Sequence, residues 1–228
     1  MNLENLKINI LGDSITAGKC ASCDENGYVG LLQKKYPNAT IRNYGDPGSC
    51  LSDKCLWGVR SFCERADEMD PDADLVMVFG GTNDYCCCCP LGQWGDKTDD
   101  TFYGACWVLF EKLLRTYHGK MIVVATPLHR LDEDGTICEE RQMVAPLWEY
   151  VRILKETAAF FGFPVIDLFA TSGLQPNIDY IREAYTVDGL HPNDAGHELL
   201  FRRVDAALRH LLYATPYQTK GTNKLIPK

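Results

Sequence analysis

The sequence predicts an α/β fold in which a five-stranded parallel sheet lies between layers of helices. Strand-like and helix-like segments alternate five times along the 228 residues, an order typical of parallel strands joined by crossover helices. Residues 75–79 and 121–125 are continuously apolar, which is typical of central strands covered on both faces. Polar, glycine-containing turns follow the first three strands. Right-handed crossovers would gather these turns at one edge of the sheet.

The first elements each have a local signal. Apolar residues at 6, 8, 10 and 11 predict a buried strand over residues 6–11 that runs into Gly12-Asp13-Ser14. A short helix over 28–36 is closed by Pro37, and a second strand, 39–44, ends in a loop that holds two glycines and a proline. Apolar residues near helical spacing then predict a helix over 52–69, which stops before Pro71.

The remaining elements follow from the same patterns. They are, in chain order, a strand over 73–81, a long loop over 85–100, a helix over 101–117, a strand over 120–127, a loop over 128–139, a helix over 140–161 with Pro146 near its start, a strand over 164–169, an irregular stretch over 170–186 and a helix over 193–212. We expect residues 1–213 to form a single domain and the polar tail, 214–228, to pack little against it.

Composition excludes several classes of protein. Hydrophobic residues make up 46% of the chain, which argues against disorder. The net charge is −8 without clustered basic residues, which argues against a nucleic-acid surface. No apolar run approaches the length of a membrane span, and the N-terminus lacks the pattern of a signal peptide. A cytoplasmic protein is the default expectation, and its oligomeric state stays open.

Side chains suited to acyl transfer follow the strands. Ser14, Gly45 and Asn83 stand at three strand ends, and Asp188 and His191 precede the last helix. A histidine can deprotonate an attacking serine, and a carboxylate three residues earlier can fix its tautomer. The N–H groups of Ser14 and Gly45 and the Asn83 amide would hold the oxyanion. Each short motif alone is also common turn chemistry, so the case depends on their joint occurrence.

The arrangement resembles the GDSL-type esterases and lipases of the SGNH hydrolase family. Four blocks carry the resemblance, in order: Gly12-Asp13-Ser14-Ile15, Asn43-Tyr44-Gly45, Gly81-Thr82-Asn83-Asp84 and Asp188-Gly189-Leu190-His191-Pro192. Ile15 departs mildly from the leucine of the family name. The resemblance covers residues 7–212 and implies a flavodoxin-like three-layer α/β/α sandwich. It also implies ester hydrolysis without a metal or other cofactor. Ser14, Asp188 and His191 would form the triad, with Asp13 and Asp84 as supports that bond to nearby backbone.

Two questions about function stay open. The substrate is expected to be a small-molecule ester, with short acyl groups on a carbohydrate or similar small alcohol favoured over a lysophospholipid or thioester. Loops 86–100 and 171–185 would shape the pocket, Trp94, Tyr103 and Tyr185 would stack on a sugar, and His129 is a further lining candidate. A different class of function is a flavodoxin-like ligand-binding module without turnover, but such a module would not need Asp188 beside His191.

Eleven cysteines are many for a chain of this length. Eight lie in loops after the first three strands: Cys20, Cys23, Cys50, Cys55, Cys86, Cys87, Cys88 and Cys89. Free thiols, a disulfide between two loops and a structural zinc site are the three interpretations. We expect hydrolysis to need neither a metal nor a particular thiol.

Overall fold

The computed structural model describes residues 3–138 and 140–214 and contains the expected parallel sheet. Its strands are β1 (Lys7–Gly12), β2 (Thr40–Gly45), β3 (Leu75–Phe79), β4 (Met121–Ala125) and β7 (Val165–Ile166). They lie in the order β2-β1-β3-β4-β7, and all pairs are parallel. This is the flavodoxin-like strand order, whose ligands bind where the order reverses beside the first strand. The α/β fold and the five-stranded sheet are therefore confirmed.

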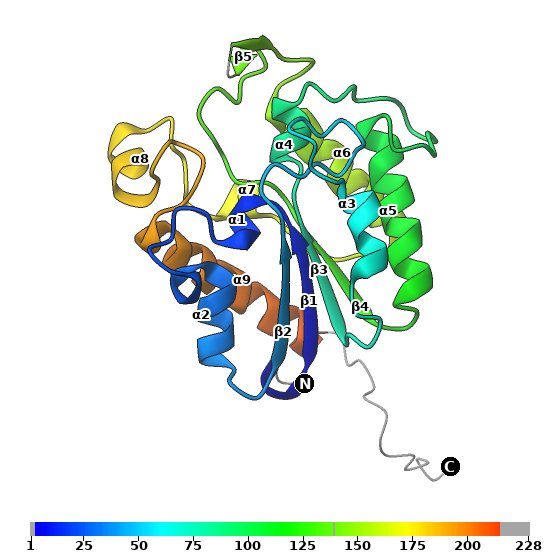
Figure 1. Ribbon diagram of the computed structural model, residues 1–228, viewed down its shortest axis with the longest axis vertical. Helices are drawn as coiled ribbons and strands as arrows, with labels where there is room; N and C mark the ends of the chain where they lie inside the picture. Colours follow the sequence, from blue (N-terminus) through cyan, green and yellow to red (C-terminus); the bar gives the residue numbers. More distant parts are fainter. Residues whose placement is uncertain (1–2, 139, 215–228) are drawn as a thin grey trace.

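Helices cover both faces of the sheet (Figure 1). On one face lie α2 (Tyr28–Lys35) and α9 (Asp194–Ala214), and on the other lie α3 (Phe62–Arg65), α5 (Phe102–Thr116) and α6 (Leu147–Phe161). Alternate strand residues separate into two cores, so that Val76 and Val78 pack with α5 whereas Leu75 and Met77 pack with α9. This period of two is what strands buried on both faces require.

Short elements surround the carboxyl ends of the strands (Figure 1). They are α1 (Ser14–Ala17), α4 (Thr82–Cys86), α7 (Leu168–Thr171) and α8 (Asp179–Tyr185), with a hairpin of β5 (Ile137–Cys138) and β6 (Arg141–Gln142) above them. Short 3₁₀ turns lie at η1 (Leu3–Asn5), η2 (Asp24–Asn26) and η3 (Ala66–Glu68). Because α1 and α4 begin directly after β1 and β3, their first side chains lie at the switch point of the sheet.

Two predicted helices begin later than expected. The segment expected as a helix over 52–69 becomes helical only at Phe62, where Ser61 and Glu64 form a capping box. Residues 51–60 form an irregular loop instead. The helix expected over 140–161 begins at Leu147, directly after Pro146. Proline lacks the backbone N–H that a helix interior needs, so the helix starts after it. The irregular stretch over 170–186 contains the helix α8.

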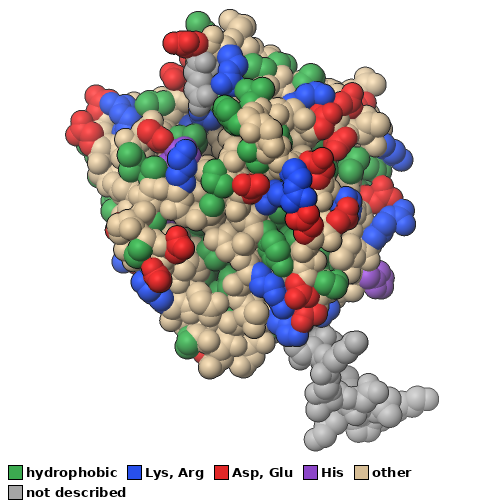
Figure 2. Space-filling view, in the orientation of Figure 1, with side chains coloured by type: hydrophobic (Ala, Val, Ile, Leu, Met, Phe, Trp, Pro, Cys, Tyr) green, Lys and Arg blue, Asp and Glu red, His purple; other side chains and the backbone are tan. Residues whose placement is uncertain are grey.

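The last described helix ends near the expected C-terminal boundary of the domain. The helix α9 ends at Ala214, one residue beyond the expected domain boundary, and residues 215–228 of the expected tail lie outside the described residues. No helix in the described ranges is long and apolar enough to cross a membrane. Figure 2 shows acidic and basic side chains interspersed on one face of the molecule.

Candidate active site

Ser14, His191 and Asp188 form a continuous chain of hydrogen bonds. The Ser14 Oγ lies 2.9 Å from the His191 Nε2, and the His191 Nδ1 lies 2.7 Å from the Asp188 Oδ2. Ser14 comes from the start of α1, and the other two come from the loop before α9. A serine and a carboxylate on opposite nitrogens of one imidazole are the geometry that a nucleophile, a base and an orienting group need.

Local structure holds the histidine loop. The Asp188 Oδ1 accepts hydrogen bonds from the backbone N–H groups of Leu190 and His191, at 3.0 and 2.7 Å. An isolated bridge pairs Thr186 with Pro192 and closes the loop. Gly189 at its tip has φ +78°, a left-handed conformation that suits glycine. The loop therefore presents the His191 ring in one orientation.

Burial and the nearby charge shift the pKa of His191 in opposite directions. Burial lowers the pKa of His191 below its ordinary value, although the Asp188 carboxylate favours the charged imidazolium. Burial also favours the protonated form of Asp188, but hydrogen bonds from His191 keep the pKa of that carboxyl below its ordinary value. At neutral pH the pair is therefore a neutral imidazole beside a carboxylate.

A pocket of about 240 Å³ opens at Ser14. Its lining residues are Ser14, Lys19, Pro47, Gly48, Trp57, Asn83, Leu190 and His191. Asn83 lies in the first turn of α4, and its amide donates one hydrogen bond to the Ser49 carbonyl at 3.0 Å. A side-chain amide has two N–H groups, and the part of the chain that the structure describes takes up one of them, so the second is available to a ligand in the pocket.

Gly45 does not line this pocket. Its backbone N–H donates to the Asn43 Oδ1 at 2.9 Å, and a Cβ on Gly45 would meet the backbone of Ala17 at 2.2 Å. Gly45 is therefore the point at which β2 packs against α1. Gly48, three residues later, lies in the pocket wall with φ +85°. From the sequence we expect Gly45 to face Ser14, but the structure places Gly48 there, because the loop after β2 carries both glycines and only its three-dimensional path decides which one reaches the pocket.

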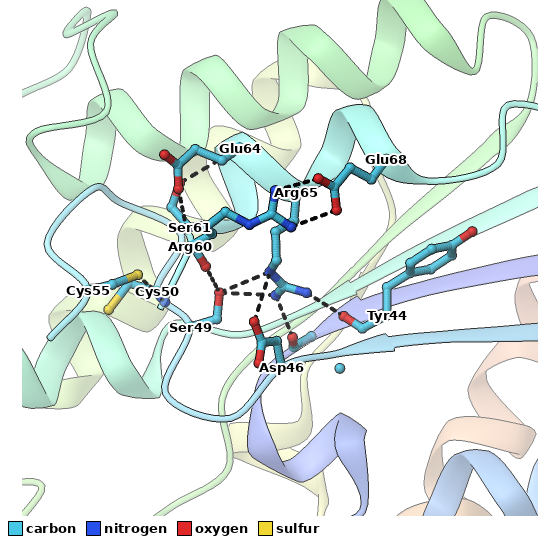
Figure 3. Close-up of polar contacts among 12 residues, drawn as sticks. Tyr44, Asp46, Ser49, Cys50, Cys55, Arg60, Ser61, Glu64, Arg65 and Glu68 are labelled. Carbon is cyan, nitrogen blue, oxygen red and sulfur yellow. Dashed lines mark hydrogen bonds and ion pairs between the residues drawn. The ribbon is translucent and has the colours of Figure 1, made fainter. Parts of the chain in front are cut away.

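A buried arginine ties the strand ends to this loop (Figure 3). The Arg65 guanidinium donates to the carbonyls of Gly12 and Tyr44, both at 2.8 Å, and to the Ser49 Oγ at 3.0 Å. These contacts join the end of β1, the end of β2 and the residue after Gly48. This role of Arg65 is not predictable from the sequence, since a buried arginine in a short helix has no local signature.

Two buried carboxylates lie beneath the site. Asp13 caps α1 by accepting from the Ile15 N–H at 2.9 Å. Asp84 accepts from the backbone N–H groups of Leu51 and Ser52 and from the Ser52 hydroxyl, at 2.7 to 3.0 Å. Burial raises the pKa of both, to about 7 for Asp13. Both bind nearby backbone, as expected of supports, and neither lines the pocket at Ser14.

Other candidates lie elsewhere. His129 packs on Phe169 and binds Glu133, away from the pocket. Trp94 packs edge-on against Trp107 and Tyr103, so these rings form a separate aromatic cluster. Among the described residues, the pocket lining includes none from the loops 86–100 and 171–185, and so not Tyr185. The exposed aromatic residue that does line the pocket is Trp57. A larger cavity of about 600 Å³ lies among α1, α2 and β2 and shares no lining residue with the pocket at Ser14.

The loop cysteines fall into separate groups. All ten cysteines whose side chains the structure describes are free thiols. The Cys50 thiol contacts those of Cys55 and Cys87, and the Cys50 N–H lies 3.1 Å from the Cys55 Sγ (Figure 3). Cys86 and Cys89 are buried in the core. Cys20 stands apart from these, beside the histidine loop.

Comparisons with known proteins agree with the fold and the motifs. A model of the GDSL-like lipase/acylhydrolase family matches residues 10–199. One solved structure is 31% identical with a TM-score of 0.81, covering 92% of this chain and 99% of its own. A protein from Lactobacillus plantarum is 28% identical with a TM-score of 0.79 over the same shares. A two-domain esterase active on acetylated mannans is 20% identical with a TM-score of 0.61, covering 98% of this chain and 53% of its own. The search of curated proteins found no match.

Proposed function

The chain belongs to the GDSL-like lipase/acylhydrolase family, and on that premise we propose that it is a serine ester hydrolase that works through an acyl-serine on Ser14. The observation that carries the proposal is the 2.9 Å contact between the Ser14 Oγ and the His191 Nε2. A ligand-binding module without turnover has no need of a serine hydrogen-bonded to a histidine that is oriented by a carboxylate.

The proposed reaction has two half-cycles. The Ser14 Oγ attacks the acyl carbon while the His191 Nε2 takes its proton, and the imidazolium then gives this proton to the leaving alcohol. Water, deprotonated by His191, attacks the acyl-serine, and the proton returns to Ser14 as the acid leaves. Asp188 holds the proton on the His191 Nδ1, so that Nε2 keeps its lone pair for the incoming proton.

We assign the oxyanion donors to the Ser14 N–H, the Gly48 N–H and the Asn83 side-chain amide. Ser14 is the first residue of α1, so its N–H has no partner within the helix. Gly48 replaces the expected Gly45, because Gly48 lines the pocket whereas the Gly45 N–H is bound to Asn43. Donors fixed by the fold stabilise the developing charge without reorganisation.

The size of the pocket supports short acyl esters. Its volume of about 240 Å³ is below the roughly 300–1,000 Å³ of pockets that enclose drug-sized ligands. Trp57 and Leu190 line it together with the polar Lys19 and Asn83. We propose O-acetyl groups on a carbohydrate or similar small alcohol as substrates. The activity on acetylated mannans of one protein that shares the fold is consistent with this choice.

A labelling experiment tests the function directly. A fluorophosphonate should label the protein once, on Ser14, and nitrophenyl acetate should be hydrolysed. Ser14→Ala should abolish labelling and lower kcat for nitrophenyl acetate by at least about 10⁴-fold, with an unchanged circular dichroism spectrum. Ser22→Ala, an exposed serine in the loop after α1, is the matched control.

The substrate class needs a separate measurement. Nitrophenyl esters of graded chain length and a panel of acetylated sugars should show the highest kcat/KM for acetyl groups. A preference for long chains or for lysophospholipids would favour the lipase alternative. If the protein is neither labelled nor hydrolyses any of these esters, a binding module is the remaining function.

A further inference from the structure

Cys20 lies beside two of the residues that form the proposed hydrolytic site. One potential ligand atom from each of Cys20, Asp188 and His191 lies within 4.8 Å of the other two. Cys20 occupies the turn after α1 with φ +70°, and Lys19 and Ala21 on either side donate to the carbonyls of Ser14 and Gly18. The turn therefore holds the thiol in front of the histidine loop.

We propose that Cys20, Asp188 and His191 bind a zinc ion, and that this ion blocks hydrolysis. Thiolate, imidazole and carboxylate are the three ligand types that zinc takes in proteins. Zn–S and Zn–N distances of about 2.3 and 2.0 Å place tetrahedral ligands about 3.5 Å apart, and the three ligand atoms already lie within 4.8 Å of one another. Cys20 is partly exposed and Asp188 is exposed, so solvent reaches the site.

An ion on the histidine removes the base whichever nitrogen it occupies. On Nε2, zinc takes the lone pair that would accept the Ser14 proton. On Nδ1, it forces the remaining ring proton onto Nε2, which then donates to Ser14 and cannot accept from it. Zinc binding and ester hydrolysis are therefore mutually exclusive.

Proton release accompanies binding. Cys20 is a free thiol, and a cysteine binds zinc as the thiolate, after loss of its S–H proton. Zinc replaces that proton: the S–H bond breaks, the S–Zn bond forms and H⁺ leaves to solvent. The site therefore takes up one zinc ion in exchange for the thiol proton, without an oxidant or reductant.

The choice of variants must separate this site from the other thiols. Cys50, Cys55 and Cys87 are in contact and offer an alternative binding place for a thiophilic ion. Cys20→Ser removes one ligand of the proposed site and no residue of the hydrolytic machinery. Cys20→Asn, a residue that tolerates left-handed backbone, is the second variant. Cys23→Ser, an exposed thiol in the same loop, is the matched control.

Cobalt titration of the full-length protein measures binding without reference to activity. Co²⁺ should produce a thiolate-to-cobalt charge-transfer absorption at one equivalent, displaced by Zn²⁺. This absorption should be absent in Cys20→Ser and Cys20→Asn and retained in Cys23→Ser. Its persistence in both Cys20 variants, or its absence in the parent protein, would overturn the proposed site.

Inhibition of turnover is the second measurement, and it alone rests on the proposed function. The zinc concentration for half-inhibition should increase about tenfold or more in Cys20→Ser, which corresponds to at least about 1.4 kcal/mol, while basal activity stays as in the parent. Equal inhibition of parent and Cys20→Ser would overturn the inhibitory role. If no ester is hydrolysed, the function fails while the cobalt titration still decides the metal site.

Discussion

Asp188 leaves about half of its side chain exposed, whereas the His191 ring that it orients, 2.7 Å away, is 8% exposed. The carboxylate thus remains hydrated while the imidazole does not. Desolvation disfavours the charged imidazolium, and a hydrated carboxylate offsets this only in part. The balance keeps the His191 ring neutral to lower pH than a histidine in water.

The pH dependence of hydrolysis should follow this balance. Because only neutral His191 accepts the Ser14 proton, kcat/KM should increase with pH through the pKa of His191. That pKa is lowered, so the midpoint should fall below the ordinary value of about 6.5. Initial rates with nitrophenyl acetate from about pH 4 to about pH 8 measure the midpoint. A midpoint above the ordinary value would contradict the dominant role of burial.

Asp188→Asn serves as the diagnostic variant for the same profile. It removes the charge that favours imidazolium, so the midpoint should move to still lower pH. The plateau should fall on the order of 10²- to 10⁴-fold, because the amide does not hold the required tautomer. Asp179→Asn, an exposed carboxylate of α8 paired with Arg182, should alter neither quantity.

The oxyanion assignment predicts a loss in kcat for Asn83→Ala. Removal of one preorganised donor should lower kcat on the order of 10²- to 10³-fold with little change in KM, because the charge exists only in the transition state. The Asn83 amide also binds the Ser49 carbonyl, so a thermal melt must accompany the kinetics. A change confined to KM would make Asn83 a residue that binds the ground state.

The strands of the sheet and the site residues directly after them were predictable from the sequence, but the residues that form the pocket wall were predictable only in part. Continuous apolar runs specify buried parallel strands, and the residues directly after them must lie at one edge, as Ser14 and Asn83 do. Gly48 and Trp57 belong to segments whose paths depend on tertiary contacts. Apolar spacing predicts a helix from residue 52, yet residues 51–60 are irregular, because Asp84 binds the N–H groups of Leu51 and Ser52 and holds the segment in another conformation.

The position of Trp57 predicts its effect on acyl-chain length. Its ring lies 3.1 Å from where a Cβ on Gly48 would stand, at the wall of the pocket, and 59% of the residue is exposed. Trp57→Ala should open this wall and raise kcat/KM for longer acyl esters relative to acetyl, whereas Trp94→Ala in the separate aromatic cluster should leave the ratio unchanged. An unchanged ratio in Trp57→Ala would remove this residue from chain-length selection.

Asp13 should make the protein less stable as pH increases. Burial raises the pKa of Asp13 to about 7 from an ordinary value of 3.8, and Asp84 adds to the shift while Arg65 and Arg130 oppose it. Between these pH values the folded protein holds a proton that the unfolded chain has lost. The free energy of unfolding therefore declines across this interval and keeps its lower value at higher pH.

Asp13→Asn should remove that decline. The amide oxygen that replaces the carboxylate can still accept from the Ile15 N–H, but the amide cannot ionise. The variant should match the parent near pH 4 and exceed it near pH 8 by on the order of a few kcal/mol. Urea unfolding at several pH values measures both curves. Asp84→Asn is the contrast, because its carboxylate accepts three hydrogen bonds and an amide oxygen serves them less well, so stability should fall at neutral pH. Parallel curves for the parent and Asp13→Asn would mean that Asp13 stays ionised in the fold, with Arg65 and Arg130 outweighing its burial.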